Sequence, residues 1–324
     1  MQNYNYKKLW HNLRSSRIEH CSEMFSCNHN KIVVKAEHSL VSQGTEKLLL
    51  TQKLNGITYN KMKVPYLEGE FGTDFTYGYS LSGYILDGPT NVQNRKVHLM
   101  HPHQELAFVN LNDVVFIEDC DLKTASLASN VETALNAIWD SGFSIGENVL
   151  IIGYGMIGAL LAAILKAGNP GELSIIEKDQ NRLDLCVKHG FNAANNTINM
   201  SNEYDIIFNT TSSQEGLQLA IDNAGFESKI IELSWYGNTD LNLKLGDKFH
   251  YNRVKIISSQ VSNLPPSKMG RWDPKRRKRM VFNILQTTDL AHLLTREVPF
   301  DQTPEFYDQL RNGKVNDIGV TIKY

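Results

Sequence analysis

The chain has 324 residues, 41% of them hydrophobic, and a formal net charge of −2. That length is sufficient for two domains with separate cores, and the small net charge argues against nucleic acid as a partner. No apolar run reaches membrane-spanning length, the first sixteen residues lack the apolar core of a signal peptide, and the four cysteines show no C-x-x-C spacing. The composition therefore predicts a cytoplasmic protein without a membrane segment, a disulfide framework or a zinc ribbon.

Short β-type runs dominate roughly the first 120 residues. They lie at 31–36, 83–86 and 96–99 and are separated by turn residues such as Asp87-Gly88-Pro89. Runs of this length between turn signals predict an antiparallel or barrel-like β domain.

From about residue 122 the pattern changes to alternating helices and strands. Apolar residues at helical spacing predict a helix over 125–140, and a second helix begins at Asp273-Pro274, with Asp as N-cap and Pro at the first helical position. Short apolar runs predict the strands of a doubly wound parallel sheet. These runs are 149–152, 173–176, 205–208, 229–233 and 254–258. The tail, 293–324, returns to short strands and turns.

The most specific motif follows the first of these strands. Residues 153–158 read Gly-Tyr-Gly-Met-Ile-Gly, and an alanine- and leucine-rich helix pattern begins at once. In such a loop Gly153 makes the tight turn, Gly155 admits a pyrophosphate to the backbone, and Gly158 lets the helix pack on the strand. The first turn of the helix, including Met156 and Ile157, offers free N–H groups to the phosphates. The motif therefore predicts a dinucleotide site.

An acidic residue ends the second strand at the spacing that this motif requires. Glu177 is placed to accept hydrogen bonds from the adenosine ribose and to repel a 2′-phosphate, which favours NAD. Lys178 and Arg182 follow closely and would serve a 2′-phosphate if the loop turned differently. NADP is therefore the less favoured alternative.

Three segments carry a resemblance to a known family. Residues 42–46 (Ser-Gln-Gly-Thr-Glu), 78–83 (Gly-Tyr-Ser-Leu-Ser-Gly) and 295–300 (Thr-Arg-Glu-Val-Pro-Phe) resemble segments of the medium-chain dehydrogenase/reductase superfamily. The nearest resemblance is to its dehydrogenases with Ser-x-Gly-Thr-Glu and His-Pro-His-Gln segments. It implies a GroES-like β-rich catalytic domain (1–122), a Rossmann nucleotide-binding domain (123–288) and a return to the catalytic domain (289–324). It also implies a homodimer that pairs through the strand at 254–258.

The chain departs from the zinc-dependent members of that superfamily at the metal ligands. Gln43, Tyr79 and Ser80 stand where those members carry cysteine, histidine and glutamate. An amide, a phenol and a hydroxyl are not a zinc ligand set, so we expect an enzyme without zinc. A site rebuilt from other side chains remains the alternative. Its candidate ligands are His98, His101, His103 and Glu132.

Without a metal, the proton must be handled by a hydroxyl or an imidazole. The resemblance places Thr45 and Tyr79 beside the nicotinamide, and His101 and His103 lie two residues apart after a predicted strand. Each of the four is a candidate acid/base, and a structural role is the alternative for each.

The densest charge run, 275–279 (Lys-Arg-Arg-Lys-Arg), lies at the start of the last predicted helix. It either anchors an anion, such as a carboxylate or phosphate on the substrate, or forms a solvated helix face. Glu132 either orients a histidine or is solvated.

The resulting hypothesis is a zinc-independent, NAD(P)-dependent oxidoreductase that interconverts an alcohol and a carbonyl on a small or medium-sized organic molecule. The alternatives are reduction of an activated C=C bond and a dinucleotide-binding protein without catalysis.

Overall fold

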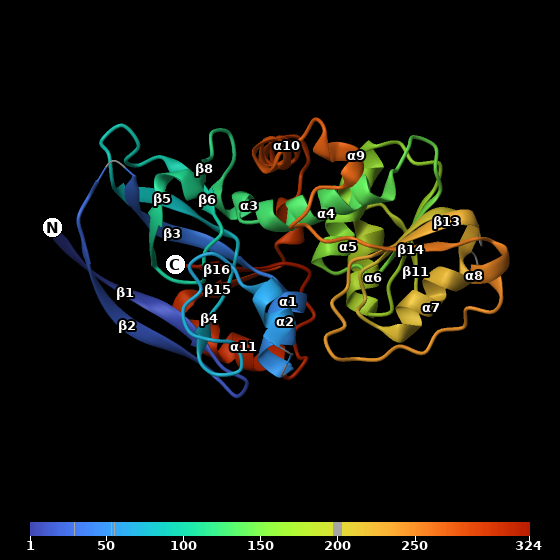
Figure 1. Cartoon of the computed structure of the whole chain (residues 1–324), viewed down its shortest axis with the longest axis horizontal. Coiled ribbons are helices and arrows are strands. Elements are labelled where there is room, and N and C mark those ends of the chain that lie inside the picture. The colour runs from blue at the N-terminus through green and yellow to red at the C-terminus, as the bar shows by residue number, and fades with distance from the viewer. Residues whose placement is uncertain (29, 53, 55, 197–202) are drawn as a thin grey trace. The chain divides into compact units, whose positions relative to one another are not determined.

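The computed structural model describes residues 1–28, 30–52, 54, 56–196 and 203–324 (Figure 1). The chain forms two compact units. Unit 1 contains Met1–Ser129, Leu294–Val315 and Gly319–Tyr324, and unit 2 contains Asn130–Leu293 and Asn316–Ile318. Both the first and the last part of the described chain therefore contribute to unit 1.

Unit 1 begins with a long antiparallel hairpin. Strands β1 (Gln2–His11) and β2 (Ser16–Phe25) pair along their whole length, and β4 (Phe75–Thr76) joins the other edge of β1. Alternate residues of β1, such as Tyr4 and Tyr6, are buried. This alternation is typical of a strand with one face on a core.

The larger sheet of unit 1 has the order β15-β16-β3-β5-β6-β8, with β7 paired to β3 outside this order. Its neighbours are antiparallel except for β15 and β16, which are parallel. The strands are β3 (Lys31–Val41), β5 (Leu81–Asp87), β6 (Lys96–Leu99), β7 (Leu106–Asn110), β8 (Val114–Phe116), β15 (Arg296–Pro299) and β16 (Val320–Lys323). The predicted β-rich domain is confirmed.

Four helices belong to unit 1, apart from short 3-10 turns, among the described residues. They are α1 (Gln43–Thr51), α2 (Gly56–Met62), α3 (Leu122–Ala125) and α11 (Thr303–Arg311). The expectation of only strands and turns in the tail was wrong, because α11 has Phe306, Tyr307 and Leu310 at helical spacing and buries them in the core around α1. Pro304 in the first helical turn is compatible with this start.

Unit 2 is built on a six-stranded parallel sheet in the order β11-β10-β9-β12-β13-β14. The strands are β9 (Val149–Ile152), β10 (Leu173–Ile176), β11 (Asn192–Ala194), β12 (Tyr204–Asn209), β13 (Ala224–Glu232) and β14 (Lys255–Ser258). The chain winds outward from β9 in one direction and then from β12 in the other. This confirms the doubly wound Rossmann fold, whose ligand site lies at the carboxyl end of β9.

The helices of unit 2 include the crossovers of this sheet. Helix α5 packs on β9 and β10, α6 on β11, and α7 on β12 and β13. The helices are α4 (Ala128–Ser141, whose first two residues belong to unit 1), α5 (Met156–Ala167), α6 (Gln180–Lys188), α7 (Gln214–Asp222), α8 (Lys248–Tyr251), α9 (Pro266–Met269) and α10 (Pro274–Thr287). Asp273 caps α10 as predicted, because its carboxylate accepts the backbone N–H of Arg276. None of the described helices is both long and apolar enough to cross a membrane.

Candidate functional site

The glycine-rich loop of unit 2 has the geometry that the motif predicts. Gly153 has a φ of +97°, which favours glycine, and a Cβ on Gly158 would lie 2.0 Å from the carbonyl oxygen of Gly153. By contrast, a Cβ on Gly155 would meet a single neighbour, the Arg182 guanidinium at 3.6 Å. Gly153 and Gly158 are therefore required by the fold, whereas Gly155 leaves open space above the backbone.

That open space lies at the start of α5. Gly155 is the N-cap of α5, has no side chain to satisfy the first N–H groups, and is followed directly by Met156 and Ile157. Free N–H groups and the positive end of the helix dipole favour an anion here. The cradle fits the pyrophosphate of a dinucleotide.

Glu177 lies beside the same loop. It is buried, and its two carboxylate oxygens accept the backbone N–H groups of Tyr154 at 2.7 Å and Asp179 at 2.9 Å. Its negative charge is thereby fixed at the end of β10, next to the glycine loop. Lys178, the next residue, is exposed.

Arg182 is the cation of this site that lies closest to the loop. Its guanidinium reaches over Gly155, and its Nε donates to the carbonyl oxygen of Asn316 at 3.0 Å. Asp179 caps α6 by accepting the backbone N–H of Arg182, which fixes where the side chain starts. A positive group is thus held where phosphates would bind.

In unit 1 the structure brings Thr45 and Tyr79 together, as expected. The Tyr79 hydroxyl donates to the Ser42 hydroxyl and also interacts with the Thr45 side chain. Ser42 is the N-cap of α1, and Thr45 lies in its first turn. Burial raises the pKa of the Tyr79 phenol and the charge of Glu46 raises it further, whereas Ser42 and Thr45 lower it. This cluster of three hydroxyls can transfer a proton.

The two histidines of the His-Pro-His segment have different surroundings. His101 stacks on Tyr66 with ring centroids 5.2 Å apart, its Nδ1 donates to the carbonyl oxygen of Pro102, and burial lowers its pKa to about 4. His103 is fully buried, with Nδ1 2.8 Å from the Ser39 hydroxyl and Nε2 3.5 Å from Glu46. The two histidines are thus held by different partners, and each set of contacts is typical of a structural histidine.

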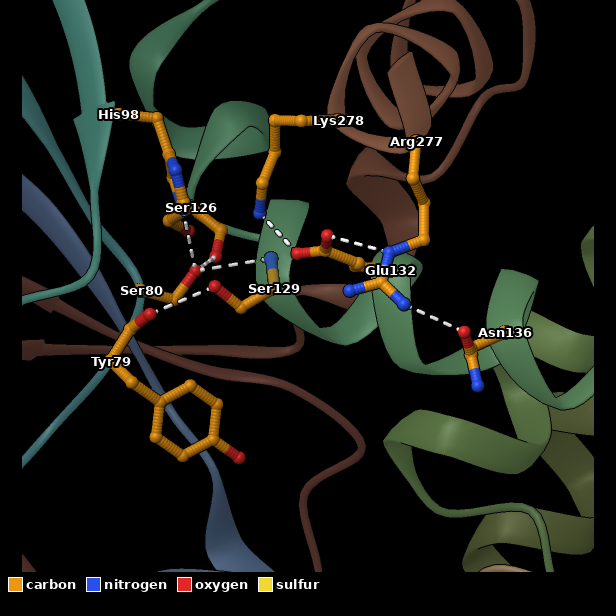
Figure 2. Close-up of polar contacts among 9 residues, drawn as sticks. All are labelled: Tyr79, Ser80, His98, Ser126, Ser129, Glu132, Asn136, Arg277 and Lys278. Atoms are coloured by element: carbon orange, nitrogen blue, oxygen red, sulfur yellow. Dashed lines mark hydrogen bonds and ion pairs between the residues drawn. The ribbon is translucent and has the colours of Figure 1, made fainter. Parts of the chain in front are cut away.

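Ser80 forms a second polar cluster with its own partners (Figure 2). Its hydroxyl donates to the carbonyl oxygen of Ser126 at 2.5 Å, so His98 Nε2, 3.0 Å away, must be the donor to Ser80. Ser129 donates its own hydroxyl to the Tyr79 carbonyl oxygen at 2.8 Å, and the Tyr79 ring points away from this cluster.

These contacts bear on the alternative of a rebuilt zinc site. Among the described residues, no group of three or more His, Cys, Asp or Glu side chains is arranged to hold a metal. The four proposed ligands instead have separate partners, and the residues at the family's ligand positions carry no thiolate, imidazole or carboxylate. The donor set present does not fit a zinc ion.

Within unit 2, Glu132 forms ion pairs with two residues of the basic run at 275–279 (Figure 2). Glu132 accepts from Arg277 Nε at 2.9 Å and from the Lys278 ammonium, and Arg277 also donates to Asn136 at 2.7 Å. Both alternatives considered for Glu132 were therefore wrong: it neither orients a histidine nor is solvated, because α4 buries it against α10. Two of the five residues of the basic run, Arg277 and Lys278, therefore bind an internal carboxylate, that of Glu132.

The sequence analysis missed Ser42, Glu46 and Tyr307. Glu46 is 2% exposed and accepts from the Ser42 backbone N–H at 2.7 Å and from the Tyr307 hydroxyl at 2.5 Å. The available signal was weak, because Glu46 lies between Thr45 and Lys47 and the apolar run of the helix begins only at Leu48. Tyr307 had no such signal, because it lies 261 residues away on an unexpected helix.

The chain is similar in sequence and in fold to known dehydrogenases. No family model matches the chain. The D-guloside 3-dehydrogenase of Escherichia coli K12 is 22% identical over 257 residues, covering 73% of this chain and 68% of the relative. Two solved structures have TM-scores of 0.78 at 15% identity: the 2R,3R-butanediol dehydrogenase of Bacillus subtilis (99% of this chain, 100% of that chain) and the galactitol-1-phosphate dehydrogenase of Escherichia coli (98% and 100%). At such identities the structures establish a shared fold.

Proposed function

We propose that this chain is a member of the medium-chain dehydrogenase/reductase superfamily, to whose dehydrogenases it is similar, and that it is an NAD(P)-dependent dehydrogenase that interconverts an alcohol and a carbonyl without zinc. The observation that carries the proposal is the Tyr79 phenol, which stands at a metal-ligand position of the family and is held by the hydroxyls of Ser42 and Thr45.

The dinucleotide half of the proposal rests on the glycine loop. A bound nicotinamide dinucleotide supplies the hydride acceptor or donor. The first turn of α5 would hold its pyrophosphate, Gly155 leaves room for it, and the Arg182 guanidinium would add a positive charge. We propose NAD as the preferred form, because the carboxylate of Glu177 is fixed beside the loop and disfavours a 2′-phosphate.

Tyr79 handles the proton in this proposal. In the reducing direction its phenol donates a proton to the oxygen of the carbonyl as hydride arrives at carbon, and the phenolate that is left takes up a proton from solvent through Ser42 and Thr45. The oxidising direction is the reverse, in which the phenol first loses its proton along the same route and then accepts the alcohol proton. The raised pKa keeps the phenol protonated at neutral pH, which suits the acid role. Ser42 and Thr45 orient the hydroxyl and can pass the proton onward.

The relatives suggest the class of substrate. Two of the three are named for carbohydrate derivatives and the third for a diol, so each acts on a molecule with several hydroxyl groups. We propose a small polyol or hydroxy-carbonyl compound as the substrate, in which the neighbouring hydroxyls supply hydrogen bonds for recognition.

The test combines three measurements on the purified chain. A panel of polyols, hydroxyketones and enones is assayed with both nicotinamide cofactors, with and without a chelator, and the zinc content is measured. We expect turnover on a polyol–ketone pair that the chelator leaves unchanged, with less than one zinc per chain. Tyr79→Phe should lower turnover about 10²–10⁴-fold, the usual contribution of a positioned general acid.

Three results contradict the proposal in different ways. Turnover confined to enones would indicate C=C reduction, and saturable NADH binding without turnover would indicate a binding protein. One tightly held zinc, with activity lost on chelation, would restore a metal mechanism.

A further inference from the structure

The buried carboxylate of Glu46 is hydrogen-bonded to the backbone of Ser42, whose hydroxyl contacts Tyr79. We infer that Glu46 is a positioning residue, whose charge and hydrogen bonds keep Tyr79 in its acid form and hold the first turn of α1 against it, with Tyr307 of α11 holding the carboxylate in turn. The inference rests on the proposed function, since it gives Glu46 a role in the chemistry of Tyr79.

In the described part of unit 1, Glu46 has no lysine or arginine within ion-pair distance. It is 2% exposed and lies in the core that contains Leu48, Phe306 and Tyr307. Its Oε2 lies 3.5 Å from His103 Nε2. Burying a carboxylate in such surroundings costs several kcal/mol unless hydrogen bonds compensate. A charge kept at that cost indicates a role beyond packing.

Two donors compensate the carboxylate, one on each oxygen. The backbone N–H of Ser42 donates to one oxygen at 2.7 Å, and the Tyr307 hydroxyl donates to the other at 2.5 Å. Both oxygens therefore act as acceptors. Glu46 thus connects the start of α1 to α11.

The first connection determines what the Ser42 side chain does. Ser42 is the N-cap of α1, but its hydroxyl makes no cap hydrogen bond and instead receives the Tyr79 hydroxyl. Glu46 fixes the backbone of the same residue by accepting its N–H. Moving the carboxylate would therefore move the hydroxyl that orients Tyr79.

The second effect is electrostatic. After burial itself, the charge of Glu46 is the remaining influence that raises the pKa of Tyr79, and it opposes Ser42 and Thr45. Other titratable groups around the cluster come from several elements. They are Tyr77 before β5, His103 after β6, Tyr307 on α11 and Tyr324 after β16. Burial raises the pKa of each of these tyrosines, so they stay neutral and Glu46 supplies the charge.

The experiment compares Glu46→Gln with Glu70→Gln, which makes the same change at an exposed position. The chain is labelled with ¹³C at the tyrosine ring, and the Tyr79 signal is assigned by its loss in Tyr79→Phe. In Glu46→Gln the Tyr79 signal should titrate at lower pH than in the unaltered chain, and kcat should fall about 10²-fold, the cost of misplacing a catalytic group by about 1 Å. The Kd for NADH should stay the same, since unit 2 holds the dinucleotide. Glu70→Gln should change none of these.

The outcomes separate this inference from the proposed function. If Tyr79→Phe retains full turnover, the proposed function fails whatever Glu46 does. If Tyr79→Phe is inactive but Glu46→Gln keeps the Tyr79 titration and kcat of the unaltered chain, the inference about Glu46 is overturned. If Glu46→Gln does not fold, Tyr307→Phe is used, because it keeps the charge and removes one donor. It should move the Tyr79 signal and lower kcat severalfold, and an unchanged signal and kcat would likewise overturn the inference.

Discussion

The carboxylate of Glu177 accepts the backbone N–H of Tyr154 at 2.7 Å, which ties the end of β10 to the glycine loop that follows β9. Its other oxygen accepts the N–H of Asp179, the N-cap of α6. Glu177 therefore fixes the shape of the loop as well as placing a negative charge beside it. A single substitution should affect both the cofactor affinity and the cofactor preference.

Glu177→Gln tests that dual role. We expect the affinity for NADH to fall about tenfold, because one charge-assisted hydrogen bond to the loop is weakened. The preference for NADH over NADPH should narrow as well, because the charge that disfavours a 2′-phosphate is gone. Fluorescence titration with both cofactors measures this, with the exposed Asp184→Asn on α6 as the matched control. Equal affinities for the two cofactors in the unaltered chain would contradict the proposed preference.

Gly155 and Gly158 should respond to substitution in opposite ways. Gly155→Val should abolish the binding of both dinucleotides but leave the melting temperature nearly unchanged, because a side chain there enters the open space over the loop. Gly158→Ala should lower the melting temperature, since its Cβ would lie 2.0 Å from the Gly153 carbonyl oxygen. Calorimetry and NADH titration on both variants distinguish the two roles. A Gly155→Val protein that still binds NADH would place the dinucleotide elsewhere.

The stability of the fold should depend on pH through its buried histidines. Burial lowers the pKa of His101 to about 4, from an ordinary value of 6.5. As the pH falls from 6.5 towards 4, the unfolded chain takes up a proton that the folded chain does not. The contribution of His101 is fully present above pH 6.5 and is lost in that window, on the order of 3 kcal/mol.

Urea unfolding between pH 4 and 8 measures this dependence. His101→Asn should flatten the curve, although His11 should keep part of the slope because burial lowers its pKa as well. Replacing the exposed His250 by Asn is the control. An unaltered slope in His101→Asn would show that His101 does not titrate in this way.

Strand β14 is an edge that a second copy of the chain would cover. It closes one side of the sheet of unit 2, and Ile256 on it is 39% exposed. We expect a homodimer in which the two β14 strands pair, because an uncovered apolar edge favours association. Light scattering at micromolar concentration should give twice the chain mass for the unaltered chain and the single mass for Ile256→Lys. A monomer before substitution would exclude this arrangement.

Local sequence signals were sufficient for the fold class and for the shape of the glycine-rich loop. The glycine loop depends on residues within a few positions of each other, and its steric requirements at Gly153 and Gly158 can be read from the motif alone. Five of the six strands of unit 2 overlap the predicted apolar runs, and general rules for parallel sheets apply to them, whereas β11 (Asn192–Ala194) has no such run and was not predicted.

Contacts between distant parts of the chain were not predictable in this way. Glu46 meets Tyr307 across 261 residues, and Glu132 meets Arg277 across 145. No sequence motif links the two residues of either pair. The sequence alone therefore does not distinguish a carboxylate that is buried with a partner from one that is exposed to solvent. Helix α11 was missed for a related reason: its nine residues are too few for a strong periodic signal, and packing on α1 stabilises it.

The position of β16 determines the order in which the chain can fold during its synthesis. This strand, Val320–Lys323, fills the place between β15 and the 38–41 part of β3, and it is made almost 280 residues after β3. The sheet of unit 2 is complete once β14 has left the ribosome, so that sheet can form while unit 1 still lacks a strand. Until β16 arrives, the hydrogen-bonding groups of β3 at His38–Val41 have no strand partner on that side.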